Sequence, residues 1–362
     1  MRRRAPTHAH PRAAVARELA QAFVILLAIV GTTAVLLAAG GYAVGDGLAA
    51  LWRGSMGSWY AFSSATLVRA IPLMLTGVAV AIAFRAGVLN IGAEGQLLAG
   101  AAGATAVALW LDGLPAVIVV VLALAASAVG GAGWASIAAF LRSRFGVLEV
   151  ISTIMLNFIA LHAVSYLVRG PLQEPTHVYP QSSTIGDALH LPRIAGAGRL
   201  HGGLLLALGA SIVAGWVLRR TAAGFRLIAA GESPSAATSA GGIDVMVTTT
   251  LTFLVSGALA GLAGGVEVLG VTFALYENIS PGYGYTAIAV ALLARLDPWR
   301  VAATALLFGG LEAGAGAMQR DAGVPSTLVT VIEAALILAV IAVGALRRRS
   351  PVPDAATAPI AA

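Results

Sequence analysis

Stretches of about twenty apolar residues recur along the whole chain, and this recurrence constrains the fold more than any other feature. A membrane-spanning helix needs about 20 consecutive, mostly apolar residues to cross the hydrocarbon core of a bilayer. Of the 362 residues, 59% are apolar and only 10% are charged, whereas soluble domains carry about 25% charged residues. The sequence therefore predicts an all-α polytopic membrane protein.

The apolar stretches predict about ten transmembrane helices, near residues 20–41, 60–83, 93–111, 115–141, 150–169, 201–218, 248–270, 283–297, 300–318 and 325–346. The first stretch is longer than the apolar region of a signal peptide, which has about 7–15 residues, so we expect it to remain as the first span. The predicted organisation is a basic cytoplasmic tail over 1–19, a transmembrane domain over 20–346 and a disordered cytoplasmic tail over 347–362.

All 22 basic residues are arginines, and most of them lie in alternate loops between the apolar stretches. Short cytoplasmic loops of membrane proteins carry an excess of basic residues. With the N-terminus inside, ten spans place these clusters on the cytoplasmic side: Arg85, Arg142, Arg144, Arg219, Arg220, Arg226, Arg295, Arg300 and 347–349. We therefore expect both termini in the cytoplasm, and we expect no nucleic-acid partner because the arginines mark topology.

Several kinds of chemistry are excluded by residues that the chain lacks. Without lysine there is no Walker A loop, whose lysine reaches the nucleotide phosphates, so ATP-driven work requires the ATPase of a partner. Without cysteine there is no thiol nucleophile or Cys-based metal site, and the six histidines show no ligand spacing. No enzyme motif is present, and we expect no enzymatic activity, no metal and no cofactor.

The stretch "GVLNIGAEGQLLAGA", residues 87–101, interrupts the apolar pattern with Asn90, Glu94 and Gln96. Gly87, Gly92 and Gly95 would let the backbone leave regular helix there. One interpretation is a broken helix that presents polar groups to a solute path, as in transporters. The alternative is an ordinary turn at the membrane surface, with Glu94 stabilising the N-terminus of the following helix. The residues alone leave both interpretations open.

Other polar residues lie inside predicted spans. Ionisable groups at membrane depth are functional candidates by default, although a structural ion-pair network is the alternative. These candidates are Arg69, Glu267, Glu312 and Glu333. Asn157 and Thr153 share one helical face, and we expect hydrogen bonds to another helix from them. We add Glu333 and Asn157 to the candidates for the substrate path.

The inner loop over 219–247 contains the signals of a short helix at 234–240. Ser233 suits the N-cap, Pro234 the first helical position, and Gly241 or Gly242 the C-terminal cap. Small side chains such as Ala236 and Ala237 would fit a shallow groove on a cytosolic partner. The alternative is a simple turn between two spans.

Glycines at four-residue spacing indicate close helix packing. Gly257, Gly261 and Gly265 form one such series, and Gly310 and Gly314 repeat the spacing. Small residues at this spacing let transmembrane helices approach closely, so we expect packing rather than chemistry from them.

Four stretches resemble permease subunits of ABC importers in the branched-chain amino acid and simple-sugar superfamily. They are "FRAGVLNIGAEGQLLAGA" (84–101), "LEVISTIMLNFIALHAVSYLVRGPLQEP" (148–175), "GYTAIAVALLARLDP" (284–298) and "MQRDAGVPSTLVTVIEAALIL" (318–338). The resemblance covers about 84–340, and "NIGAEGQ" is similar to the nucleoside or simple-sugar branch. The chain departs from the usual pattern at Ala294 and Ala334, where family members have glycine.

The resemblance implies a permease similar to those of type II ABC importers, in the bacterial cytoplasmic membrane. It implies a cytosolic ATPase that contacts the helix at 234–240, a second related permease and an extracytoplasmic solute-binding lipoprotein. The solute would be a nucleoside or a simple sugar. The alternative function is an ATP-independent secondary transporter or channel for a small polar solute.

Overall fold

The computed structural model describes residues 11–111, 113–194 and 198–346, and its regular structure over these ranges is entirely helical apart from isolated β-bridges. This confirms the all-α prediction. The helices are α1 (Pro11–Ala39), α2 (Val44–Ser55), α3 (Trp59–Ala61), η1 (Phe62–Thr66), α4 (Leu67–Arg85), α5 (Ala93–Trp110), α6 (Ala116–Phe145), α7 (Glu149–Val168), η2 (Asp187–Leu189), α8 (Gly203–Arg220), α9 (Ala222–Glu232), α10 (Pro234–Gly241), α11 (Val245–Glu267), η3 (Val268–Thr272), α12 (Tyr283–Leu293), α13 (Pro298–Asp321) and α14 (Ser326–Leu346).

Six helical segments in the described ranges are long and apolar enough to cross a membrane. They are Trp59–Arg85, Ala116–Phe145, Glu149–Val168, Gly203–Arg220, Val245–Thr272 and Pro298–Asp321. The chain is therefore a multi-pass membrane protein, while the count of about ten crossings stays a prediction.

α1 begins at Pro11, so the described part of the expected basic tail is helical, while the extent of that tail stays a prediction. The predicted span 283–297 is wrong in length, because α12 ends at Leu293 and has 11 residues. Arg295 and Leu296 both adopt a φ of +57°, which ends the helix. The expected tail over 347–362 lies outside the described residues.

The chain forms two compact units. One comprises Leu51–Gly314, and the other combines the described residues up to Ala50 with those from Ala315 onward. In the second unit α1 packs along α14, and the backbone at Gly40 lies close to Leu328.

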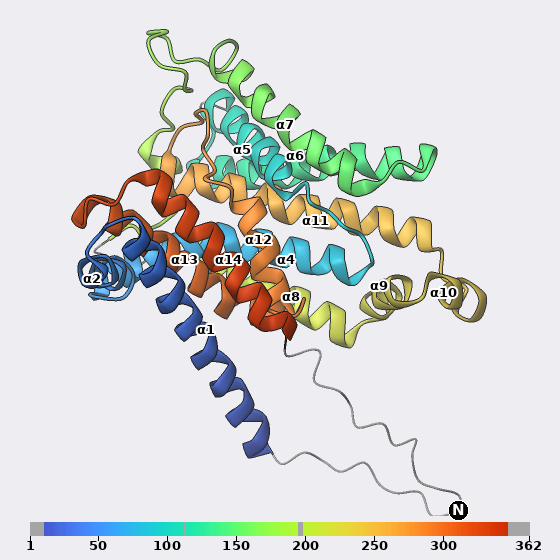
Figure 1. The fold of residues 1–362 in the computed structure, drawn as a ribbon. Coiled ribbons are helices and arrows are strands. Elements are labelled where there is room, and N and C mark those ends of the chain that lie inside the picture. The colour runs from blue at the N-terminus through green and yellow to red at the C-terminus, as the bar shows by residue number, and fades with distance from the viewer. Residues whose placement is uncertain (1–10, 112, 195–197, 347–362) are drawn as a thin grey trace, which may run out of the picture. The chain divides into compact units, whose positions relative to one another are not determined.

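In the first unit α11 packs against α4, α5 and α6, as Figure 1 shows near the centre of the ribbon. Almost every side chain of α4 is buried, as expected of a helix that is apolar on all sides. α6, α7 and α8 expose many apolar side chains instead, which suits a surface in contact with lipid. Of the polar residues described below, Asn90, Gln96 and Ser256 are fully buried among these helices.

The expected glycine packing is confirmed at Gly257, Gly261, Gly265 and Gly314, whereas a Cβ at Gly310 would come no closer than 3.6 Å to its neighbours. A Cβ atom added at Gly257 or Gly261 of α11 would overlap the backbone of α6 near Gly131, and one at Gly264 would overlap α5. At Gly314 it would lie 2.6 Å from the carbonyl oxygen of Leu51. These helices are thus in backbone contact, which larger residues would prevent.

Candidate functional site

The candidate site is the non-helical segment between α4 and α5, residues 86–92. Gly87 has a φ of +70°, and a Cβ there would lie 3.2 Å from the Cα of Gly231, so this position requires glycine twice over. Gly92 is the N-cap of α5. The structure corrects the role of Gly95, which lies inside α5 and not in the break. A Cβ at Gly95 would come within 3.0 Å of both Asn157 and Trp134, so close packing explains this glycine.

Asn90 and Gln96 form a reciprocal pair of amides. The Asn90 Nδ2 donates to Gln96 Oε1 and the Gln96 Nε2 donates to Asn90 Oδ1, each at 3.0 Å. Asn90 Nδ2 also donates to Ser256 Oγ at 2.9 Å, and its Oδ1 accepts from the Gly92 N–H at 3.0 Å. Ser256 in turn donates to the carbonyl of Ala79 at 2.9 Å. Both amides are fully buried, and this network ties the break to α4 and α11.

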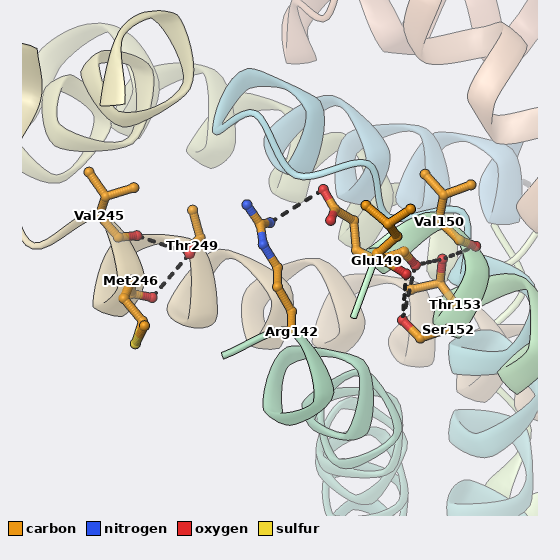
Figure 2. Close-up of polar contacts among 9 residues, drawn as sticks. Arg142, Glu149, Val150, Ser152, Thr153, Val245, Met246 and Thr249 are labelled. Atoms are coloured by element: carbon orange, nitrogen blue, oxygen red, sulfur yellow. Dashed lines mark hydrogen bonds and ion pairs between the residues drawn. The ribbon is translucent and has the colours of Figure 1, made fainter. Parts of the chain in front are cut away.

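Asn157 of α7 holds the other side of the break. Its Oδ1 accepts from the Gly95 N–H at 2.8 Å, and its Nδ2 donates to the carbonyl of Ile91 at 2.9 Å. The same Nδ2 donates to the Tyr285 hydroxyl at 3.2 Å. The predicted hydrogen bonds to other helices are therefore confirmed for Asn157. Thr153 instead donates to the carbonyl of Glu149 in its own helix, at 2.6 Å (Figure 2).

Glu94 joins two helix N-termini. It lies in the first turn of α5, and its carboxylate accepts from the Gly284 N–H of α12 at 2.7 Å. A Cβ at Gly284 would overlap the backbone of Glu94, so the two helices touch at their first turns. A negative charge is favourable at a helix N-terminus. Glu94 therefore stabilises the N-terminus of α12 as well as the N-terminus of its own helix, α5.

α12 is too short to cross a membrane by itself. Its 11 residues rise about 16 Å, which is about half of a 30 Å hydrocarbon core. The C-terminal end of α12 lies beside Arg85, whose Nε donates to the carbonyl of Leu296 at 3.1 Å. The junction lies at the first turn of α12. Arg85 and Arg295 lie at the other end of this helix, about 16 Å away along its axis. Such an arrangement resembles the discontinuous helices that transporters place around their solutes.

Tyr285 is a site residue that the sequence analysis missed. It lies in the first turn of α12, its side chain is 44% exposed, and its hydroxyl accepts from Asn157. Ser280 was missed as well; its Oγ accepts from the backbone N–H groups of Gly282 and Tyr283. Both lie about 190 residues from the break in sequence, so no local pattern could connect them with it.

Three of the remaining charged candidates, Arg69, Glu267 and Glu312, act electrostatically on Tyr283, the first residue of α12. Glu267 is buried at the end of α11, and Arg69 and Arg199 are close enough to act on its carboxylate electrostatically. Glu312 lies close enough to Tyr283 to act on it electrostatically, as Glu267 and Arg69 do. Glu333 is in α14, and its side chain lies outside the described residues.

The predicted helix at 234–240 is present as α10, over Pro234–Gly241, with Gly242 in the left-handed conformation at its C-cap. Ser233 occupies the N-cap position, but its side chain makes no capping hydrogen bond there. Ala236 is exposed and Ala237 is buried, so only Ala236 of the two can contact a partner. The structure also shows α9, which the sequence analysis missed. Thr221 caps α9 by accepting from the Gly224 N–H at 3.1 Å.

Comparison with known proteins identifies related transporters. The family described as "Branched-chain amino acid transport system / permease component" matches residues 62–341. The guanosine ABC transporter permease protein NupP of Bacillus subtilis is 38% identical over 338 residues, which are 91% of this chain and 96% of that protein.

Two further relatives have similar coverage. The glucose ABC transporter permease protein TsgB13 of Haloferax volcanii is 40% identical over 75% of this chain and 74% of its own length. The nucleoside ABC transporter permease protein NupB of Lactococcus lactis is 32% identical over 84% and 85% respectively. No solved structure is significantly similar to the chain.

Proposed function

Because the chain belongs to the family of branched-chain amino acid transport system permease components, we propose that it is the membrane-spanning subunit of an ABC importer for a nucleoside or a simple sugar. Its relatives are ABC permeases named for guanosine, for nucleosides and for glucose. These relatives disfavour the alternative of an ATP-independent transporter or channel.

The observation that carries the choice of a neutral solute is the bond between Glu94 and Gly284. The N-terminus of a helix attracts anions, but at α12 the Glu94 carboxylate already occupies that position. The other side chains that hydrogen-bond at the junction are neutral: the amides of Asn90, Gln96 and Asn157, the phenol of Tyr285 and the hydroxyl of Ser280. Such groups can donate to and accept from hydroxyls and base edges, and they provide no countercharge for an anion.

We assign different roles to these residues. Asn90 and Gln96 are fully buried and bonded to each other, so they hold the shape of the break. Glu94 and Asn157 border the solute path beside Tyr285, and Glu333 is a further candidate. Binding must be weak enough for release, which suits a few hydrogen bonds made in passing.

The energy comes from a separate ATPase, because the chain has no lysine for a Walker A loop. α10 is the element that contacts this ATPase. Closure of the ATPase subunits would shift α10 and switch the permease between outward-facing and inward-facing states. An extracytoplasmic binding lipoprotein delivers the solute at the opposite face.

The second permease is a different chain. Bacillus subtilis, Haloferax volcanii and Lactococcus lactis each have two matching permeases, named for the same solute within each organism. In each organism this chain is more similar to one member, with identities of 38% against 27%, 40% against 33% and 32% against 25%. We infer that the partner resembles the second member of each pair.

The test is reconstitution of the permease with its ATPase, second permease and binding lipoprotein. Proteoliposomes containing ATP should accumulate labelled guanosine or labelled glucose, and a catalytically inactive ATPase should abolish uptake. Uptake that persists without ATP hydrolysis would establish the ATP-independent alternative. Uptake of phosphorylated but not neutral solutes would refute the choice of solute class.

A further inference from the structure

A cavity of about 200 Å³ lies between the C-terminal end of α6 and the N-terminal end of α11. Its lining changes from apolar to polar: it includes Phe253, Ala139, Thr249, Thr250, Ser143 and Arg142. Val245 and Met246, the first two residues of α11, also line it. Phe253 and Ala139 also belong to the buried cluster that contains Ala86 and Val88 of the break, but the function proposed above assigns no role to the cavity.

The packing of the two helices explains why the cavity is there. Between Gly257 and Gly265, glycines bring α11 into backbone contact with α6 or α5. Toward its N-terminus α11 carries larger side chains, including the fully buried Phe253, which hold the helices apart. The gap opens at the end that carries Arg142 and Arg144.

Arg142 brings a positive charge to this cavity, and the hydrogen-bonding capacity of its guanidinium is only partly used. Its Nη1 lies 3.5 Å from Glu149 Oε1, as Figure 2 shows, but this buried nitrogen makes no hydrogen bond to any described residue. The N-terminus of α11 contributes further N–H donors, next to the Asp244 carboxylate at its N-cap. Asp244 accepts from the Val247 N–H at 2.9 Å, which leaves the N–H groups of the two preceding residues without an intrahelical acceptor.

The surface beside the cavity is apolar. Val247, Leu251 and Val255 lie on one face of α11 at four-residue spacing, and each is about half exposed. Phe140, on the same helix as the lining residues Ala139 and Ser143, is 59% exposed. A ligand that fits this environment carries an anionic head for Arg142 and apolar chains for the exposed stripe. In a membrane, that ligand is an anionic phospholipid, because basic pockets at the ends of transmembrane helices bind such headgroups.

We propose that the cavity between α6 and α11 binds the phosphate of an anionic phospholipid through Arg142 and the N-terminus of α11, with an acyl chain along Val247, Leu251 and Val255. Lipid bound there braces α11 directly after α10. It therefore acts on the connection between the proposed ATPase contact and the core of the permease.

Native mass spectrometry of the assembled importer tests the proposal, with dioleoyl phosphatidylglycerol and dioleoyl phosphatidylcholine as probes. The wild type should retain phosphatidylglycerol in preference to phosphatidylcholine. Arg142→Gln should weaken retention of phosphatidylglycerol by about tenfold or more, since a hydrogen bond to a charged group is removed. The matched control is Arg144→Gln, because Arg144 lies over the Phe145 ring and does not line the cavity. Its retention should equal that of the wild type.

A second variant covers the case in which Arg142→Gln fails to assemble. Thr250→Trp fills the cavity from a half-buried position and leaves Arg142 and Glu149 in place, so it should also lose the lipid. Equal retention of both lipids by the wild type, or equal losses in the two arginine variants, would overturn the proposal. Competition by millimolar glycerol phosphate would point to a free phosphate site, and loss of a protein subunit with unchanged lipid retention would point to a protein interface.

Discussion

The polar side chains at the break differ in how much of their hydrogen-bonding capacity the protein uses. Asn90 uses two donors and two acceptor interactions, all with described neighbours. Glu94 accepts from the Gly284 N–H and from the Ser280 side chain, two bonds for a carboxylate that can accept about four, and the residue is 7% exposed. A side chain with every group occupied fixes structure, whereas one with free acceptor capacity can exchange partners. We therefore expect different consequences when the two are replaced.

Glu94→Gln should lower uptake by about tenfold or more, with the complex assembled normally. The amide oxygen can still accept from Gly284, but the negative charge facing the helix N-terminus and the solute is gone. The measurement is uptake of labelled solute by proteoliposomes. Near-normal uptake would leave Glu94 with a capping role only.

Asn90→Ala should act on stability instead. It leaves the Gln96 amide and the Gly92 N–H buried without a partner, at a cost of about 1–3 kcal/mol. The thermal midpoint of the purified complex reports this cost. An unchanged midpoint together with lost uptake would place Asn90 on the solute path itself.

The sequence predicted the polar break correctly because an asparagine, a glutamate and a glutamine within seven residues are exceptional in such an apolar chain. It could not predict the partners of these residues. Ser256, Tyr285 and Gly284 lie 166, 128 and 190 residues away from the groups that they bond. Ser256 and Gly284 are ordinary residues for a transmembrane helix, so nothing in their local sequence marks them.

His201 precedes α8 and is 1% exposed, with no hydrogen-bond partner for Nε2 among the described residues. Burial, with a smaller contribution from the Arg199 charge, lowers its pKa from 6.5 to about 4. The unfolded chain therefore binds a proton near pH 6.5, whereas the folded protein binds it only near pH 4. Between these values the free energy of unfolding falls as the pH falls, by about 3 kcal/mol in total.

His201→Asn removes this titration, so its thermal midpoint should vary less between pH 6.5 and 4 than that of the wild type. His177→Asn, at an exposed position between α7 and η2, is the matched control and should keep the wild-type profile. Parallel profiles for the wild type and His201→Asn would contradict the assignment.

At the scale of elements, α5 and α12 both begin at the junction, and the first turn of each helix faces the first turn of the other. For α5 the sequence predicted the start within a residue, because Gly92 and the polar cluster interrupt the apolar run. For α12 the sequence predicted a span over 283–297, whereas the helix ends at Leu293. The apolar character of the sequence indicates an apolar environment, but it does not indicate where the backbone stops being helical. The positive φ at Arg295 and Leu296 is a property of the turn with α13.

α10 provides the prediction at this scale. Ala236→Trp places a bulky side chain on the exposed face of α10, and it should reduce transport-coupled ATP hydrolysis by about tenfold or more by blocking the contact with the ATPase. Ala236→Ser keeps the side chain small and should behave as the wild type. The substitution leaves the buried Ala237 untouched, so membrane insertion should be normal. Normal coupling in Ala236→Trp would refute the docking role of α10.

At the scale of the whole molecule, the contacts of the arginines sort the helix ends into two groups. Arg85 donates to Leu296, and Arg219 forms an ion pair with Asp297, so α4, α8 and α12 share one end. Arg169, after the last residue of α7, forms an ion pair with Glu277 at 2.6 Å. α7 separates this pair from Glu149 and Arg142 by 20 residues, or about 30 Å. The two ion pairs of α7 therefore belong to opposite ends of the helix.

This sorting agrees with the alternation that the sequence predicted, and it leads to a test of topology. With the arginine-rich end in the cytoplasm, a reporter fused after Gly198 should be extracytoplasmic, and reporters fused after Gly242 and Ser350 should be cytoplasmic. Alkaline phosphatase is active only outside and green fluorescent protein fluoresces only inside, so paired fusions give opposite signals at each position. The ten predicted spans place five crossings, an odd number, between Gly198 and Ser350, so these two fusions should report opposite sides. If they reported the same side, the model of ten spans with both termini inside would be refuted.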